Sequence, residues 1–260
     1  MIPEELYPLF LYVLVPILGL CVGSFILEMA DRIPRNEDFI KTRSHCEACG
    51  HVLSVPDLIP VFSFLFLGGK CRYCGTKLSF WYPLAEILHA ALWFPVFLVF
   101  GFTPEAMLFA LFSSALLGLS LIDGKTGIIP PGFPIFIGLL GILRILLQVF
   151  LYRNTGFFLQ ALLGAVSVSV PLIIVYIISK ATAIGGGDIK LMAAAGLLLG
   201  WKLTILSFAL ACILGAAIHL VRMRFFGAGR VLRMGPYLAA GLYLSMLWGE
   251  QLLGWYFSLF

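Results

Sequence analysis

The chain has 260 residues, of which 61% are apolar and 12% are charged, and its mean hydropathy is +1.04. Soluble domains have about 45–50% apolar and about 25% charged residues, so this composition excludes an ordinary soluble globular protein. The net charge of +4 is small, and we expect no nucleic-acid partner. The composition predicts an all-α polytopic membrane protein that lies in a lipid bilayer.

Apolar segments follow one another along the chain. A helix that crosses a bilayer needs about 20 mostly apolar residues, and somewhat fewer if the span is short or broken. The first run follows Glu4 and Glu5 rather than a basic segment, so we expect a span there and no cleavable signal peptide. About eight transmembrane helices are predicted, at residues 9–29, 82–101, 106–122, 134–151, 157–178, 189–200 (a short one), 203–221 and 235–256.

The basic residues indicate the orientation of these spans, because cytoplasmic loops carry an excess of Lys and Arg. With the amino terminus outside and eight crossings, fourteen of the 17 Lys and Arg residues fall on the cytoplasmic side. Arg153 and Lys202 fall outside, and Arg144 lies within a span. If segment 189–200 re-entered instead of crossing, the four arginines of the last loop would fall outside, which argues against re-entry.

The polar segment 31–81 contains two Cys-x-x-Cys pairs with the spacing of four-thiolate zinc sites. Their residues are Cys46, Cys49, Cys71 and Cys74. The segment is too small and polar to form a core, so we expect a structural Zn²⁺ to stabilise its fold. The predicted cytoplasmic location argues against disulfides. His45 and His51 flank the first pair and are either further ligands or solvated loop residues.

Two acidic residues are predicted at the cytoplasmic ends of spans. Asp123 follows the third span, and Asp188 comes directly after three glycines and before the sixth span. An ionisable side chain at the edge of the hydrocarbon is unfavourable and therefore indicates a functional site. Two neighbouring carboxyl groups share a proton, so one can activate a water while the other polarises a carbonyl group. This is the chemistry of aspartic proteases.

Other interpretations of the two aspartates stay open at this point. Asp188 could cap the following helix, or Lys125 and Lys190 could neutralise a merely structural pair. A proton-coupled transporter would use the same acids as a relay, but it would contain inverted repeats and place the acids near the bilayer midplane. A non-enzymatic zinc scaffold of a secretion machine is a further alternative.

The segment Gly185-Gly186-Gly187-Asp188 resembles the GxGD motif of type IV prepilin peptidases, the bacterial leader peptidases of type IV pilus and type II secretion systems. Further segments resemble the same family in the same order. They are Gly23-Ser24-Phe25 with Arg32-Ile33-Pro34, Pro60-Val61, Ser63, Gly69-Lys70-Cys71-Arg72, Tyr82-Pro83-Leu84 with Glu86, Asp123 with Ile129-Pro130, and Met234-Gly235-Pro236-Tyr237. The chain departs from the pattern at Leu27 and Pro131, where the family often has Asn and Asp.

The resemblance implies an aspartic endopeptidase of the bacterial inner membrane that cuts the basic leader from prepilins or pseudopilins at the cytoplasmic face. It implies Asp123 and Asp188 as the catalytic pair. Residues of the same motifs are expected to support the pair: Gly185, Gly187, Lys190 and Lys125. The expected parts of the chain are a first transmembrane helix (1–30), a cytoplasmic four-cysteine zinc loop (31–81) and a transmembrane peptidase core (82–260).

Bifunctional members of this family also methylate the new amino terminus with S-adenosylmethionine, and by resemblance this chain is expected to do the same. Glu28 and Glu86 lie near predicted cytoplasmic span ends and are candidates for the methyl-donor site. The alternative for these acids is a structural ion pair with Arg32 or Arg72. The glycines at 185–187 follow no predicted strand, which excludes a dinucleotide-type cradle.

Overall fold

The structure is a computed structural model that describes residues 8, 10–227 and 232–259. Glu4, Glu5, Leu9 and Arg230, on which parts of the predicted topology depend, lie outside the described residues. Within the described ranges every regular element is a helix, and β-type pairing is limited to two isolated bridges. The predicted all-α class is therefore confirmed.

Among the described residues, six helical segments are long and apolar enough to cross a membrane. They are Tyr12–Arg35, Trp81–Phe100, Pro104–Thr126, Gly132–Leu151, Gly156–Ile178 and Trp201–Phe226. These segments confirm a polytopic membrane protein, whereas the expected total of eight spans stays a prediction. The other two expected spans correspond to α9 (Gly186–Leu199), which has 14 residues, and α11 (Gly235–Phe257), whose 23 residues include Glu250 and Gln251.

The chain divides into two compact units, residues 1–114 and 115–260. The division falls within α5 (Pro104–Thr126), whose last turns belong to the second unit. The four cysteines of the polar segment therefore lie in the first unit, and Asp123 and Asp188 both lie in the second.

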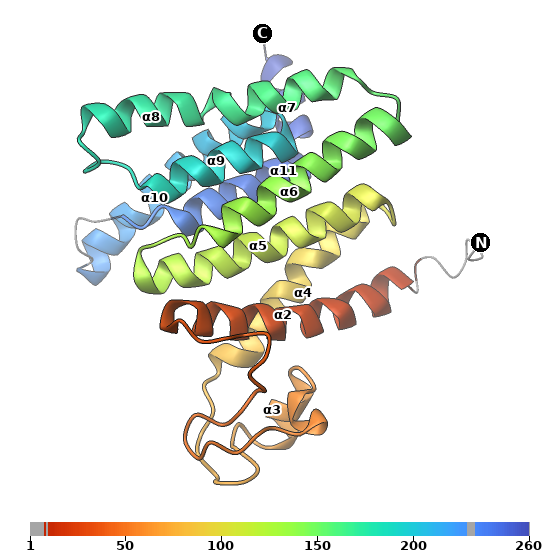
Figure 1. Ribbon diagram of the computed structural model, residues 1–260, viewed down its shortest axis with the longest axis vertical. Coiled ribbons are helices and arrows are strands. Elements are labelled where there is room, and N and C mark those ends of the chain that lie inside the picture. Colours follow the sequence, from red (N-terminus) through yellow and green to blue (C-terminus); the bar gives the residue numbers. More distant parts are fainter. Residues whose placement is uncertain (1–7, 9, 228–231, 260) are drawn as a thin grey trace. The chain divides into compact units, whose positions relative to one another are not determined.

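The first unit is built on the contact between α2 (Val15–Arg32) and α4 (Trp81–Phe100) (Figure 1). A Cβ atom at Gly19 would lie 2.8 Å from the Ala90 Cα, so only glycine allows the two backbones to pack so closely. His89 of α4 is fully buried there, with Nδ1 2.7 Å from the Gly19 carbonyl oxygen and Nε2 2.8 Å from the Ser114 hydroxyl. These hydrogen bonds satisfy both ring nitrogens inside the apolar unit.

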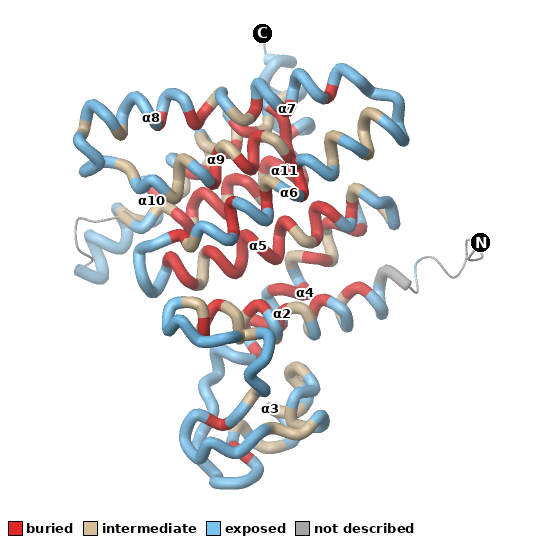
Figure 2. Tube along the Cα trace, viewed as in Figure 1, coloured by how far each residue is buried: buried red, intermediate tan, exposed pale blue. Residues whose placement is uncertain are grey.

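The segment between α2 and α4 contains only short helices: η3 (Ile33–Arg35), η4 (Val55–Leu58) and α3 (Phe62–Phe66). Ser54 and Asp57 form a capping box at the start of η4, which satisfies the free N–H groups of that turn. Most of the segment is exposed (Figure 2), and Cys46 and Cys71 are its buried residues. The polar segment thus lacks an apolar core, as expected for a loop that a metal stabilises.

The second unit is a bundle in which α9 packs on α6 (Gly132–Leu146) and α7 (Gly156–Ser167), and α10 (Trp201–Phe226) packs on α11 (Figure 1). A π-helical turn, η5 (Leu147–Leu151), continues α6. Buried residues are concentrated along α9, α11 and the part of α5 in this unit (Figure 2), and they include Leu191, Met192 and Leu242. The helix that carries Asp188 in its first turn is therefore fixed on several sides by its neighbours.

The predicted span 157–178 is interrupted in the structure. It consists of α7 and α8 (Ser169–Ile178), which are separated at Val168. Pro171 has no N–H group to donate to the carbonyl oxygen four residues earlier, and its ring crowds that turn. The break at Val168 follows from this missing hydrogen bond.

Candidate active site and metal centre

Asp123 lies near the end of α5 and is 4% exposed. Its Oδ2 accepts a hydrogen bond of 3.0 Å from the backbone N–H of Gly235, the first residue of α11. A helix amino terminus favours a negative charge, because its first N–H groups have no partner within the helix. A Cβ atom at Gly235 would lie 2.6 Å from Oδ2, so position 235 must be glycine for this contact.

Asp188 is the third residue of α9 and is half-buried. Its N–H donates to the carbonyl oxygen of Gly185 (3.2 Å), and a Cβ atom at Gly185 would lie 3.1 Å from Asp188 Oδ2. At Gly187 a Cβ atom would lie 2.9 Å from the Cβ of Ile129. Gly185 thus leaves space beside the carboxyl group, and Gly187 allows the start of α9 to pack on the segment that follows Asp123.

These contacts bring the two acids into one region of the second unit. Gly187, next to Asp188, packs on Ile129 in the segment that follows Asp123, so the start of α9 lies against the end of the Asp123 segment. Lys125 and Lys190 are exposed, and no ion pair joins Lys190 to Asp188 within the described ranges. The two aspartates are therefore neighbours, and Lys190 does not neutralise Asp188.

The four cysteines of the first unit form a compact cluster, with all Sγ atoms within 4.8 Å of one another. The Sγ atoms of Cys46 and Cys74 are 3.8 Å apart. A tetrahedral site with Zn–S distances of about 2.3 Å has S–S edges of about 3.8 Å, so the sulfur positions suit this geometry. The residues present therefore fit a metal ion with four thiolate ligands.

Each Cys-x-x-Cys pair forms the same tight turn. The N–H of Gly50 donates to the Cys46 carbonyl oxygen (2.8 Å), and the N–H of Gly75 donates to that of Cys71 (2.9 Å). Both glycines have positive φ, +69° and +72°, which glycine adopts without strain. A glycine follows the second cysteine of each pair. It is a sequence feature that indicates this tight turn, in addition to the spacing of the cysteines.

The surroundings of Cys46 and Cys74 favour thiolates, whereas desolvation and the neighbouring sulfur atoms raise the pKa of Cys49 to about 11. The hydroxyl of Thr76 lies 3.3 Å from Cys74 Sγ, and with the Thr76 N–H it lowers the pKa of Cys74 to about 6. The N–H groups of Cys49 and Ala48 lower the pKa of Cys46. Thiolates are the form that binds metal, so the turns prepare Cys46 and Cys74 as ligands for an ion.

The flanking histidines lie outside the cluster. His45 Nδ1 is 3.2 Å from the Arg43 carbonyl oxygen, and the His51 ring lies 3.6 Å from the Tyr73 ring between centroids. Within the described residues, the group that could hold a metal contains the four cysteines and neither histidine.

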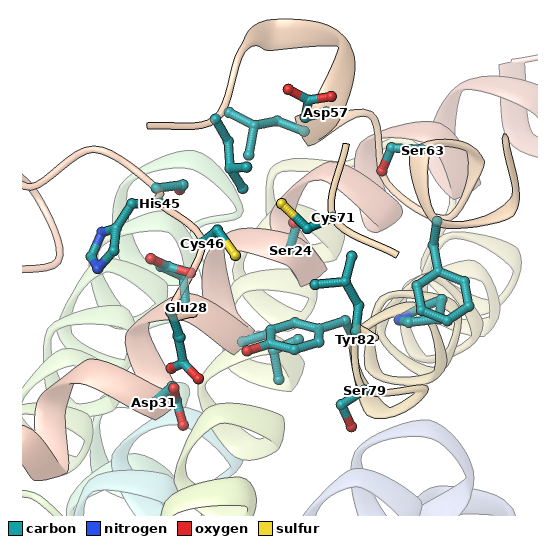
Figure 3. A pocket seen from close by; sticks show the side chains of 18 of the residues that line it. Ser24, Glu28, Asp31, His45, Cys46, Asp57, Ser63, Cys71, Ser79 and Tyr82 are labelled. Atoms are coloured by element: carbon teal, nitrogen blue, oxygen red, sulfur yellow. The ribbon is translucent and has the colours of Figure 1, made fainter. Parts of the chain in front are cut away.

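A cavity of about 760 Å³ lies in the first unit, between the end of α2, the cysteine loop and the start of α4. Figure 3 shows Ser24, Glu28, Asp31 and Tyr82 around it. Its volume lies within the range of about 300–1,000 Å³ that is typical of small-molecule sites. Acidic, basic, aromatic and apolar side chains all contribute to its walls, so it can accept an amphipathic ligand with charged groups.

The two candidate acids of this cavity have different partners. Glu28 forms an ion pair with Arg32 one turn later in α2. Glu86 is 7% exposed and accepts a hydrogen bond of 2.7 Å from the N–H of Val61. Arg72 pairs with Asp57 at 2.6 Å. The alternative considered for these acids, an ion pair with Arg32 or Arg72, is therefore present for Glu28 with Arg32, whereas Arg72 pairs with Asp57 and not with Glu86.

Comparisons with known proteins agree with this arrangement. Residues 17–100 match the bacterial peptidase A24 N-terminal domain, and residues 109–220 match the type IV leader peptidase family. A prepilin leader peptidase/N-methyltransferase of Bacillus subtilis (strain 168) is 32% identical over 94% of this chain and 96% of its own length. Proteins of the same description from Pseudomonas aeruginosa and Pseudomonas putida are 29% and 30% identical, with at least 93% of each chain covered. No solved structure matches significantly.

The fold and the site together define a polytopic helical membrane protein with a pair of neighbouring aspartates in one unit and a four-cysteine cluster in the other. The chain belongs to the prepilin leader peptidase/N-methyltransferase family.

Proposed function

We propose that the chain is a bifunctional enzyme that cleaves the leader from prepilins or pseudopilins and then N-methylates the new amino terminus. The observation that carries the peptidase assignment is the packing of Gly187, beside Asp188, on Ile129 in the segment that follows Asp123. Both residues fall in the segment 109–220 that matches the leader peptidase family. The substrate is a protein with an apolar segment that stays in the bilayer beside the enzyme.

Asp123 and Asp188 are the proposed catalytic residues. One carboxylate removes a proton from a water molecule, which attacks the scissile carbonyl carbon, while the other carboxyl group donates a hydrogen bond to the carbonyl oxygen. Collapse of the intermediate breaks the C–N bond and transfers a proton to the leaving amine. Gly235 orients Asp123 through its N–H, and Gly185 and Gly187 set the backbone around Asp188.

The proposed location is the inner membrane of a bacterium, with the active site at the cytoplasmic face. The support is the distribution of charge, since fourteen of the 17 basic residues fall on one side of the predicted topology. Lys125 and Lys190 lie on that side next to the two acids, and their exposed side chains can contact lipid headgroups.

The cysteine cluster is the proposed site of a structural Zn²⁺, held by Cys46, Cys49, Cys71 and Cys74. Four thiolates in tetrahedral geometry are typical of zinc.

The proposed methyl donor is S-adenosylmethionine, bound in the cavity of the first unit. When bound, the donor supplies an electrophilic methyl group; Glu28, Asp31 and Tyr82 line the cavity where its positive charge would be stabilised.

The test is mass spectrometry of a purified prepilin-like substrate in detergent. Wild type is expected to release the leader and, with S-adenosylmethionine, to add one methyl group. Asp188→Asn is expected to abolish cleavage, because the amide cannot exchange a proton with water in this role. Asp38→Asn, an exposed loop residue with the same change of charge, is the matched control and is expected to cleave normally. Normal cleavage by Asp188→Asn would exclude the aspartate mechanism.

A further inference from the structure

The cysteine loop contains a strained turn at the edge of the cavity. Val61 has φ +61° and ψ −51°, and the N–H of Phe62 donates to the Pro60 carbonyl oxygen at 2.6 Å. These values define a γ-turn of the rare positive-φ form. A β-branched residue in the positive-φ region is an outlier that persists only where its surroundings hold it in place.

Glu86 provides that support from another helix. Its carboxylate accepts the N–H of Val61 at 2.7 Å, and the hydroxyl of Ser24 in α2 donates to the same group. A Cβ atom at Gly23 would lie 3.1 Å from the Glu86 Cα, so α2 contacts α4 closely at this point and Ser24 reaches the acid. A single buried carboxylate therefore joins α2, α4 and the loop.

The three joined segments are walls of the cavity. Ser24, Val61 and Glu86 all line it, and Val61 is followed by further lining residues, Ser63 and Phe64. Figure 3 shows Ser24 and Ser63 at this cavity. A change in the backbone at Val61 would move this wall relative to the helices. Because Val61 and Ser24 both donate to the Glu86 carboxylate, loss of this group would release the wall of the cavity from the two helices.

We infer that Glu86 is a positioning residue, which holds the strained turn at Val61 and so shapes the cavity for the methyl donor. The inference rests on the proposed role of the cavity in donor binding. It distinguishes Glu86, which holds the wall of the cavity, from Glu28 and Asp31, which also line or border it but form ion pairs with Arg32 and Arg35 within the same segment.

The test measures donor binding and loop dynamics in the same variants. Glu86→Ala is expected to raise the Kd and the KM for S-adenosylmethionine about tenfold, through loss of a hydrogen bond to a charged acceptor. The kcat of methylation and the rate of leader cleavage are expected to stay near wild type. Hydrogen exchange at the Val61 amide is expected to become faster. Glu86→Gln retains one acceptor oxygen and should give an intermediate Kd.

A second substitution tests the role of the strain. Glycine adopts positive φ without strain, so Val61→Gly in the Glu86→Ala background is expected to recover part of the donor affinity. Val55→Gly is the matched control, because Val55 lies in the same loop, is 78% exposed and is not at positive φ. It should recover no affinity.

Three outcomes would contradict the inference. An unchanged Kd and KM for S-adenosylmethionine in Glu86→Ala would show that the Val61 turn does not affect donor binding, even if hydrogen exchange at Val61 became faster. Equal losses of cleavage, methylation and bound metal would show general support of the first unit instead of positioning. Equal recovery by Val55→Gly would exclude the strained turn as the cause. A wild type that cleaves but binds no donor would instead refute the proposed role of the cavity, and exchange at Val61 would still report whether Glu86 holds the turn.

Discussion

Asp57 connects the two halves of the cysteine loop. Its Oδ2 accepts hydrogen bonds from the N–H and hydroxyl of Ser54 and from the hydroxyl of Tyr73, and its Oδ1 accepts from Arg72 Nε at 2.6 Å. The side chain is 3% exposed. The hydrogen bonds from Ser54, followed by the one from Arg72, hold the pKa of Asp57 well below its usual range.

This low pKa gives a prediction about pH. A carboxyl group with a lowered folded-state pKa stabilises the fold fully above its unfolded pKa of about 3.9, and this contribution is lost as pH falls towards the folded value. Asp57→Asn is therefore expected to speed hydrogen exchange across residues 54–73 at pH 7, and its difference from wild type should shrink below about pH 4. Asp38→Asn should exchange like wild type. A difference between Asp57→Asn and wild type that stayed constant down to acid pH would contradict the assignment.

At the scale of single residues, local patterns could be predicted from the sequence and contacts across the fold could not. The spacing of the cysteines predicts their cluster, because each pair forms a local turn. The bond from Val61 to Glu86 joins residues 25 apart, and the bond from Gly235 to Asp123 joins residues 112 apart. Such contacts depend on how helices pack, and no local spacing encodes them.

At the scale of elements, α9 depends on close contact with its neighbours. A Cβ atom at Gly196 would overlap the backbone of Gly164 in α7, and one at Gly141 in α6 would lie 2.8 Å from the Leu197 Cβ. In a membrane, helices associate largely through such packing of small residues. The position of Asp188 at the start of α9 therefore depends on glycines well along the same helix and on its neighbours.

Gly196→Ala tests this dependence. The added methyl group is expected to destabilise the bundle by about 1–3 kcal/mol through overpacking and to reduce cleavage, because α9 shifts with Asp188. Thermal unfolding in detergent and the cleavage rate measure both effects. Gly254→Ala in α11 is the matched control, since a Cβ atom there meets nothing within 4 Å, and it should be neutral or slightly stabilising. Equal effects of the two substitutions would show that the close contact is not required.

Hydropathy predicted the long helices more accurately than the unusual ones. It identified the six spans that the structure supports, because about 20 apolar residues in sequence are a strong signal. Hydropathy predicts the span 157–178 but not the break at Val168 within it. Pro171 hardly changes the mean hydropathy, although it removes a backbone hydrogen bond. The glycine, tyrosine and tryptophan residues of α11 give it a weaker hydropathy signal than the six long spans. Its burial results from its packing on α10, which hydropathy does not describe.

At the scale of the whole molecule, the two proposed activities fall in different units. The cysteine cluster and the cavity belong to residues 1–114, and both aspartates belong to residues 115–260. Removal of the metal with a chelator is therefore expected to abolish donor binding and methylation while leader cleavage largely persists. After chelation, Cys74, which is exposed and has a pKa of about 6, should be alkylated at pH 7 before the buried Cys46.

Parallel assays of cleavage, methylation and bound metal during chelation check this prediction. Re-addition of Zn²⁺ before alkylation should restore methylation, which controls for irreversible damage by the chelator. Loss of both activities at the same rate would contradict the separation of function between the units.

The cluster also has two unlike sides. Cys46 and Cys71, the first residue of each turn, are buried, whereas Cys49 and Cys74 are exposed. A competing ligand or an oxidant from solvent therefore meets the second residue of each turn first, and a bound ion would lose its bonds to those two residues before the inner ones. Exchange of a metal bound there would therefore have a direction, outward through the edge of the loop where Cys49 and Cys74 are exposed, while the buried Cys46 and Cys71 would hold the ion last.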